Sequence, residues 1–392
     1  MQRYEQETGG RVLALAHNGN MSNGIMFPVE RNPASGKRLT GDYASSRARW
    51  EPLYEVTQIK GDGEAHPLLS PNDEFADFET LALGNLNLTV PKTDDMYQYE
   101  YAREALKNGL KLEAKLGANP YKFGMVGSSD AHTALAAMEE ENYFGKHSGT
   151  EPSPGRIDHP MAAFAGRRYE GWAMSASGYA AVWATENTRE ALWDAMMRKE
   201  VYATTGPRIL VRFFGGWDFN KADASNRLPA EVGYSRGVPM GGDLSAAPAG
   251  KSPTFLVAAM KDPFSGNLDR IQVVKGWLDE KGKTHEKVYD VVWADDDGRA
   301  KDASGKVPPV GNTVDVANAT WTNSIGDPEL ITVWEDPEFD PKQKAFYYAR
   351  VIEILTPRWT AYDAKRFGLE VGPEVPMTLQ ERAYTSPIWY TP

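Results

Sequence analysis

Asp130 and His132 stand two residues apart, directly after a short apolar run in the segment that begins at Lys122. A carboxylate and an imidazole both offer lone pairs, and the i, i+2 spacing keeps both side chains on one side of an extended segment. The turn after a strand is also where barrels and open α/β sheets present catalytic groups. The pattern therefore predicts that Asp130 and His132 bind a divalent metal ion.

Two further segments place polar side chains at the same kind of position. Residues 11–16 form an apolar run, typical of a strand covered on both faces, which stops at His17 and the sequence Asn-Gly-Asn. A second run, residues 53–59, alternates and is rich in β-branched residues before a glycine-punctuated loop begins. That loop carries Lys60, Asp62, Glu64 and His66. We expect His17 to join the metal site.

Each of these residues also has a purely structural interpretation. Asp130 could cap the helix that residues 134–140 predict, a role that is compatible with metal binding. His17 could be a buried histidine with ordinary hydrogen bonds, although its place at a strand end favours ligation. His66 precedes Pro67 in a polar loop, where metal ligation, substrate contact and simple hydration remain alternatives.

Three residues are candidates for contact with the substrate. Lys60 could be a surface lysine, but a cation beside a metal site is what a phosphate oxygen needs. Glu64 has the same alternatives as His66. Arg208 ends the run Ala-Thr-Thr-Gly-Pro-Arg, in which hydroxyls, a glycine and a guanidinium could bind an oxyanion with bidentate geometry. Its other interpretation, a hinge arginine paired with an acidic neighbour, fits the sequence slightly better.

Composition limits the classes of function. A length of 392 residues with 41% apolar content predicts a large core and two domains. The net charge of −11 argues against nucleic-acid binding, so an anionic substrate must meet local cations or a metal. The lack of cysteine excludes thiolate zinc sites, thiol nucleophiles and disulfides. No apolar stretch is long enough to predict a membrane span, and the first residues are too polar for a signal peptide.

The pattern of the chain changes near residue 205. Before it, predicted strands alternate with amphipathic helices over residues 96–116 and 188–199, so residues 1–205 are expected to form an α/β domain. After it, β-rich runs are separated by turn-rich stretches. Residues 206–392 are therefore predicted to form a β-sandwich domain.

Several of these motifs resemble those of a known superfamily. His17 in Leu-Ala-Leu-Ala-His-Asn-Gly, Glu55 in Tyr-Glu-Val and the run Gly-Ser-Ser-Asp-Ala-His that ends at His132 are similar to the later motifs of the PHP (polymerase and histidinol phosphatase) metallohydrolases. Longer runs resemble the bacterial family called domain of unknown function 3604, among them Ile-Lys-Gly-Asp-Gly-Glu-Ala-His-Pro, Glu-Val-Tyr-Ala-Thr-Thr-Gly-Pro-Arg-Ile and the closing Ser-Pro-Ile-Trp-Tyr-Thr-Pro. These runs extend across nearly the whole chain.

The resemblance implies a distorted (β/α)7 barrel with two or three divalent metals at its strand ends, and hydrolysis of a phosphoester or, in carbaryl-hydrolase-like relatives, of another ester. Matched residue by residue, His17 would be the isolated metal histidine, and Asp130 and His132 the closing Asp-x-His pair. The superfamily's opening His-x-His motif has no counterpart before residue 11. The chain thus looks like the carboxyl-terminal part of a longer protein, with an incomplete barrel, and would be periplasmic or secreted if a signal peptide lay on the missing segment.

These expectations define a metal-dependent hydrolase of a small-molecule ester, with Zn, Mn or Fe held by oxygen and imidazole ligands. We expect the present ligands to bind at most one metal and to support weak hydrolysis. An alternative is a carbohydrate- or partner-binding protein, in which aromatic side chains of the second half stack on a sugar: Trp217, Trp277, Trp293, Trp334, Trp359 and Trp389. The strand at residues 11–16 could also lie at an open sheet edge through which the chain oligomerises.

Overall fold

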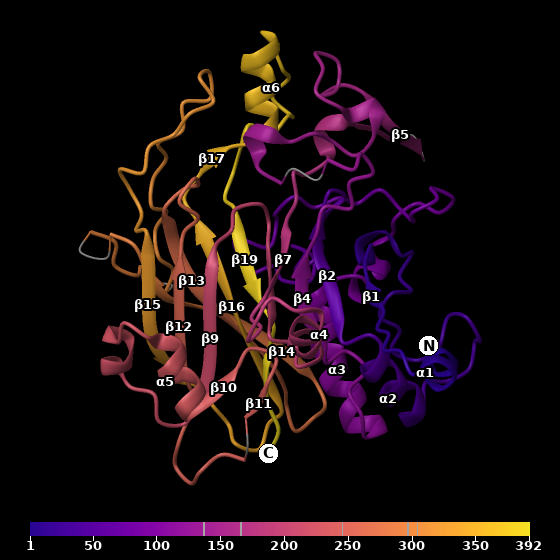
Figure 1. Cartoon of the computed structure of the whole chain (residues 1–392), viewed down its shortest axis with the longest axis vertical. Helices are drawn as coiled ribbons and strands as arrows, with labels where there is room; N and C mark the ends of the chain where they lie inside the picture. The colour runs from indigo at the N-terminus through magenta and orange to yellow at the C-terminus, as the bar shows by residue number, and fades with distance from the viewer. Residues whose placement is uncertain (136–137, 165–166, 245, 296–297, 304) are drawn as a thin grey trace.

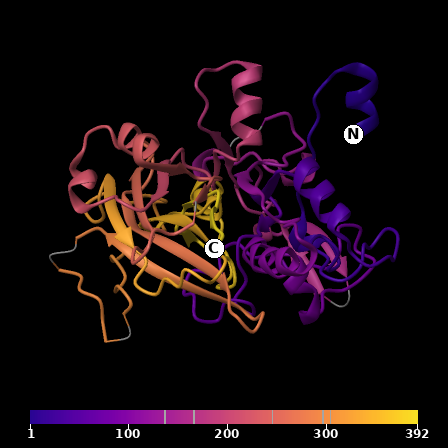
Figure 2. The same cartoon turned by 90° about the horizontal axis from the view of Figure 1, so that it is seen from below.

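The computed structural model describes residues 1–135, 138–164, 167–244, 246–295, 298–303 and 305–392. Figure 1 shows the amino-terminal half of the chain, indigo to magenta, beside the orange and yellow strands of the carboxyl-terminal half. The same separation is visible from below in Figure 2. Every helix in the described parts of the chain is too short or too polar to cross a lipid bilayer.

Three short parallel strands organise the amino-terminal half: β1 (Leu15–Ala16), β2 (Leu53–Gln58) and β4 (Gly124–Gly127). Strand β2 is central and pairs with both others in parallel. All six of its residues are buried, as expected for a strand that is covered on both faces. The helices that precede β2 and β4 are α2 (Gly41–Trp50), which the Thr40 side chain caps, and α3 (Ala102–Leu116), which ends at the left-handed Gly117.

Most of the strands that follow β4 run antiparallel to their neighbours. Strands β5 (Pro160–Phe164) and β6 (Arg167–Glu170) form an antiparallel pair. Strand β7 (Tyr179–Val182) pairs with β8 (Val201–Thr204), and helix α4 (Arg189–Met197) connects them in the sequence. Strand β2 also has a short antiparallel neighbour, β3 (Gly61–Asp62). A (β/α)7 barrel needs parallel strands around a closed ring, so the predicted barrel is wrong for this chain. The fold is mixed α/β, with mostly antiparallel sheets and no closed barrel among the described residues.

The carboxyl-terminal half is built on two large sheets. The four-stranded sheet has the order β10-β9-β12-β15. Its strands are β9 (Leu210–Gly216), β10 (Gly237–Pro239), β12 (Thr254–Met260) and β15 (Glu329–Glu335). The eight-stranded sheet includes β7 and β8 together with β11 (Asp243–Leu244), β13 (Leu268–Leu278), β14 (Thr284–Trp293), β16 (Ala345–Glu353), β19 (Arg382–Thr385) and β20 (Ile388–Tyr390).

The eight-stranded sheet is covered on both faces. On one face Tyr347 packs against Phe255 of the four-stranded sheet, with ring centroids 4.5 Å apart. Tyr348, the next residue of β16, belongs instead to the cluster formed by α3 and the parallel strands. This alternation follows from the two-residue period of a strand, and it explains why all nine residues of β16 are buried. The molecule therefore has three layers, with the eight-stranded sheet in the middle.

Strand β19 joins the two halves of the chain, because it pairs with β16 on one side and with β8 on the other. The remaining elements are peripheral. They are α1 (Gln2–Thr8), α5 (Pro229–Arg236), α6 (Trp359–Phe367), the pair β17 (Thr356–Pro357) and β18 (Thr378–Leu379), and the 3-10 helices η1 (Gly19–Met21), η2 (Asp94–Tyr99), η3 (Glu140–Asn142), η4 (Ser148–Thr150), η5 (Gly171–Ala173) and η6 (Lys221–Ser225).

Candidate functional site

Parallel pairing brings the carboxyl ends of β1, β2 and β4 to one edge of the small sheet. Polar side chains from these ends and their loops gather there, and we call them the strand-end cluster: His17, Glu55, Lys60, Asp130, His132 and Lys146. The expected convergence of Asp130 and His132 is visible in the distance of 3.1 Å between Asp130 Oδ1 and His132 Nε2. His17 is exposed and lies near enough for its charge to act on Glu55.

Two lysines surround the Asp130 carboxylate. The Lys60 ammonium forms an ion pair with Asp130 Oδ2, and Lys146 Nζ lies 3.1 Å from the same oxygen. Lys146 Nζ is also 3.1 Å from His132 Nε2. Side chains of Lys60 and Lys146 are about nine-tenths buried, whereas that of His132 is 64% exposed. The cluster thus has a buried cationic floor and an imidazole at its mouth.

Burial and mutual repulsion change the acid–base behaviour of these groups. Burial lowers the pKa of Lys60 to about 7, and the adjacent Lys146 charge adds to this effect. The Lys146 charge, more than burial, lowers the pKa of His132. Burial raises the pKa of Glu55, against the opposing effect of a hydrogen bond from Ser128. One oxygen of Glu55, Oε1, is buried and accepts no hydrogen bond from any described residue.

The backbone just before Asp130 is hydrogen-bonded to the segment that precedes β7. Asp130 has a φ of 50°, a left-handed conformation that Asp adopts more readily than most residues. The carbonyl oxygen of Ser128 accepts hydrogen bonds from Gly178 N at 3.2 Å and from the Ser177 hydroxyl. The helix predicted over residues 134–140 is not formed by the described residues of that stretch, where Ala134 has a φ of 58°, and residues 136–137 lie outside the described chain.

Lys146 was not predicted from the sequence as a site residue. It lies 14 positions after His132 in a loop without a strand or helix pattern. The contact depends on the chain folding back, so that His132 N donates a 2.8 Å hydrogen bond to the Lys146 carbonyl oxygen. Glu55 was named from the sequence only as part of a family-like motif, and its place in β2, where all six residues are buried, makes it a buried carboxylate.

Three other predicted site residues have different surroundings. Glu64 is buried in an ion-pair network with Arg103 at 2.7 Å and Arg350 at 3.3 Å. His66 stacks on Tyr97 with ring centroids 4.0 Å apart, and its Nδ1 accepts a 3.2 Å hydrogen bond from Leu68 N.

Arg208 has a side chain that is 69% exposed, with its guanidinium 3.6 Å from Glu139 and over the ring of Tyr179. The described contacts of Glu64, His66 and Arg208 do not include Asp130 or His132.

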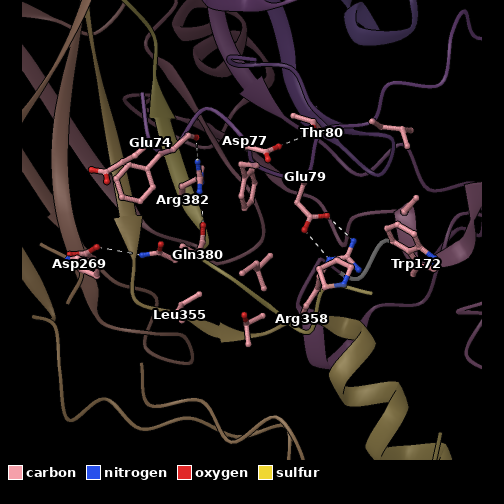
Figure 3. A pocket seen from close by; sticks show the side chains of 18 of the residues that line it. Glu74, Asp77, Glu79, Thr80, Trp172, Asp269, Leu355, Arg358, Gln380 and Arg382 are labelled. Atoms are coloured by element: carbon pink, nitrogen blue, oxygen red, sulfur yellow. Dashed lines mark hydrogen bonds and ion pairs between the residues drawn. The ribbon is translucent and has the colours of Figure 1, made fainter. Parts of the chain in front are cut away.

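A separate cavity of about 850 Å³ lies where the two halves of the chain meet. The loop of residues 74–82 and residues 169–173 form one wall, and residues 269–270 and 355–382 contribute to the other. Figure 3 shows its interior, in which Glu79 and Arg358 form an ion pair beside Trp172. Cavities of this size at the boundary between two structural units commonly bind small molecules.

The family model described as "Protein of unknown function (DUF3604)" matches residues 1–392. The chain therefore belongs to the DUF3604 family, as its motifs predicted. No curated protein and no solved structure matches the chain. The wider PHP superfamily assignment stays a prediction.

Proposed function

We propose that the chain is a metal-dependent hydrolase of phosphoesters, with the strand-end cluster as its active site. The observation that carries this proposal is the convergence of an imidazole and two ammonium groups on the Asp130 carboxylate, at the carboxyl end of three parallel strands. Sheets with parallel strands commonly bind their substrates at this edge.

The donor chemistry suits a divalent ion. Asp130 and His132 already approach one another, and the buried Oε1 of Glu55 has no hydrogen-bond partner among the described residues. Within the described chain, however, no group of three or more His, Asp or Glu side chains is arranged around one point. We therefore assign the ion to Asp130 and His132, with Glu55 and His17 of the same cluster as further candidate ligands. Carboxylate and imidazole ligands suit Zn, Mn and Fe. A bound divalent ion would supply an ionised water near neutral pH.

The chain's own cations would bind the substrate. Lys60 and Lys146 hold two ammonium groups in a partly buried site, where each interacts with a phosphate oxygen more strongly than it would in water. Asp130 keeps the two ammonium groups together despite their repulsion. The same pair would also stabilise the oxyanion of a carboxylic or carbamate ester, which remains the alternative substrate class.

Metal content tests the proposal directly. Protein dialysed against Zn, Mn or Fe(II) and then against metal-free buffer should retain one equivalent of one of these metals by mass spectrometry. Loss of even an outer partner of a ligand lowers metal affinity by about 10- to 100-fold, so Asp130→Asn and His132→Gln should lower it at least that much. His285→Gln is the matched control, because that imidazole pairs with Asp279 on the β14 side of the molecule. Wild-type protein without metal, or variants with unchanged affinity, would contradict the proposal.

Hydrolysis of p-nitrophenyl phosphate and p-nitrophenyl acetate then separates the substrate classes. We expect weak, chelator-sensitive hydrolysis of the phosphate, and a loss of at least about tenfold in kcat/KM when Lys146 is changed to Met, because a cation on the developing charge is removed. Lys287→Met, at an exposed ion pair with Glu338, is the control. If only the acetate is hydrolysed, the phosphoester assignment fails while the metal site stands.

A further inference from the structure

Arg358 places an unused hydrogen-bond donor in the wall of the cavity between the two halves. Its side chain is 1% exposed, and its Nε and Nη2 donate to the two carboxylate oxygens of Glu79 at 2.9 and 2.7 Å. Nη2 also donates to the Met174 carbonyl oxygen at 2.7 Å. Nη1 is buried and has no hydrogen-bond partner in the part of the chain that the structure describes. A buried donor without an acceptor costs about 1–3 kcal/mol, so this atom is suited to an acceptor brought by a ligand.

Arg382 adds a second cation to the same wall. It is 3% exposed, and its described hydrogen bonds go to the carbonyl oxygens of Phe75 and Gln380. Its guanidinium lies over the ring of Phe78, 3.8 Å from the centroid. Among the described residues no carboxylate forms an ion pair with Arg382, in contrast to Arg358. Its charge acts on the carboxylates of Asp62 and Glu79 from a distance, and an anionic group in the cavity could add a direct ion pair.

The rim of the cavity is acidic, in contrast to the arginines of the buried wall. Glu74, Asp77 and Glu374 line it and are exposed to solvent. Asp77 accepts one internal hydrogen bond, from the Thr80 hydroxyl at 3.1 Å. Carboxylates at a rim are acceptors for ligand hydroxyl groups. The half-buried rings of Phe75 and Trp172 add flat apolar surface to the same walls.

We propose that this cavity binds a sugar acid, a hydroxylated ring that carries one carboxylate. The carboxylate would meet Arg358 Nη1 and Arg382 on the buried wall, the hydroxyls would donate to the acidic rim, and the ring would lie against Phe75 or Trp172. A neutral sugar leaves the two guanidinium groups without an anion, and an apolar carboxylate leaves the rim without donors. The volume of about 850 Å³ has room for one or two sugar rings. The site is separate from the strand-end cluster and does not depend on hydrolysis.

Calorimetric titration of the full chain with three probes tests the ligand class. D-glucuronate should bind with one-to-one stoichiometry. D-glucuronamide, in which a neutral amide replaces the carboxylate, should bind at least about tenfold more weakly, because charge-assisted hydrogen bonds are lost. Benzoate, which keeps the charge but has no hydroxyls, should also be weaker. Failure of glucuronate to bind, or equal affinity for any two of the three probes, would overturn the proposal.

A blocking variant locates the binding. Leu355 lines the cavity and is half-buried, so Leu355→Trp should fill part of the space and reduce glucuronate binding at least about tenfold. Leu228→Trp makes the same change at an exposed leucine before α5 and should leave binding unchanged. If Leu355→Trp binds glucuronate as the wild type does while its thermal unfolding is also unchanged, the ligand lies elsewhere and the assignment is wrong. Should that variant unfold, Asp77→Ala on the exposed rim removes an acceptor for the ligand hydroxyls and should also weaken glucuronate binding; unchanged binding would contradict the assignment.

Discussion

Arg350 connects residues that are nearly 300 positions apart in the sequence. Its guanidinium, fully buried in β16, donates to Asp73 at 2.7 and 2.9 Å and lies 3.3 Å from Glu64, while Gln272 of β13 accepts from it at 2.6 Å. Two carboxylates of the amino-terminal half are thus paired with an arginine of the carboxyl-terminal half as well as with Arg103. The network gives Glu64 a role in joining the two halves.

Replacement of Arg350 should therefore be costly. Arg350→Met leaves Asp73 and Glu64 with reduced compensation inside the protein, and loss of one partner of a buried ion pair typically costs about 3–5 kcal/mol. Urea unfolding at pH 7 should show this loss. Arg3→Met is the control, since the pair of Arg3 with Glu7 is exposed and should contribute nothing measurable. Equal unfolding midpoints for both variants would show that the network does not stabilise the fold.

Residue chemistry could be predicted from the sequence only where the partners are local. Asp130 and His132 are neighbours after a strand, so their proximity followed from the spacing. Glu64 stands in a similar loop and was predicted to contact the substrate. Its partner Arg350 is 286 positions away, so no local sequence pattern could predict their ion pair. Lys146 was missed for the same reason.

At the scale of elements, the strands themselves followed from hydrophobic patterning, whereas their pairing did not. The apolar run before His17 and the alternating run that begins at Leu53 do form parallel neighbours. The pattern could not reveal that β7 and β8 turn back antiparallel and continue into the sheet of the second half, because a short buried strand looks the same in either direction. The barrel prediction failed at that point.

Gly178, directly before β7, lies against the backbone of β8 and leaves no room for a side chain. A Cβ at this position would overlap the carbonyl oxygen of Thr204 in β8, while Gly178 N supports the Ser128 carbonyl beside the strand-end cluster. Gly178→Ala should destabilise the protein by about 1–3 kcal/mol, since the backbones must separate, and should weaken metal retention. Gly155→Ala, where nothing lies within 4 Å of the added Cβ, serves as the control. The measurements are the urea midpoint and the metal content, and an unchanged midpoint for Gly178→Ala would refute the close packing.

At the scale of the whole molecule, buried carboxyl groups set the dependence of stability on pH. Burial raises the pKa of Glu353 to about 8, that of Glu140 to about 8 and that of Asp62 to about 7. Such groups stay protonated in the folded state while they ionise in the unfolded state. Their contribution is complete below the unfolded pKa of about 4 and is lost as the pH rises towards 8. Arg358 and Arg103 instead lower the pKa values of Glu79 and Glu286, whose contributions are lost in acid.

Stability should consequently be greatest near about pH 5 and fall towards pH 8. Glu353→Gln should reduce this fall by up to about 1.4 kcal/mol per pH unit, because one titrating group is removed. The test is the free energy of unfolding in urea at pH 5, 6, 7 and 8, with exposed Glu7→Gln as the control. A slope in Glu353→Gln identical to that of the wild type would contradict the assignment.

The central place of β19 has a consequence for how the protein is made. β8 ends 178 positions before β19 begins at Arg382, and β16 ends 29 positions before it, yet these two strands are joined through β19. Until β19 emerges from the exit tunnel, the middle layer has a gap between β8 and β16. During synthesis β8 and β16 therefore expose unpaired strand edges, so expression in cells should depend on chaperones that protect such edges.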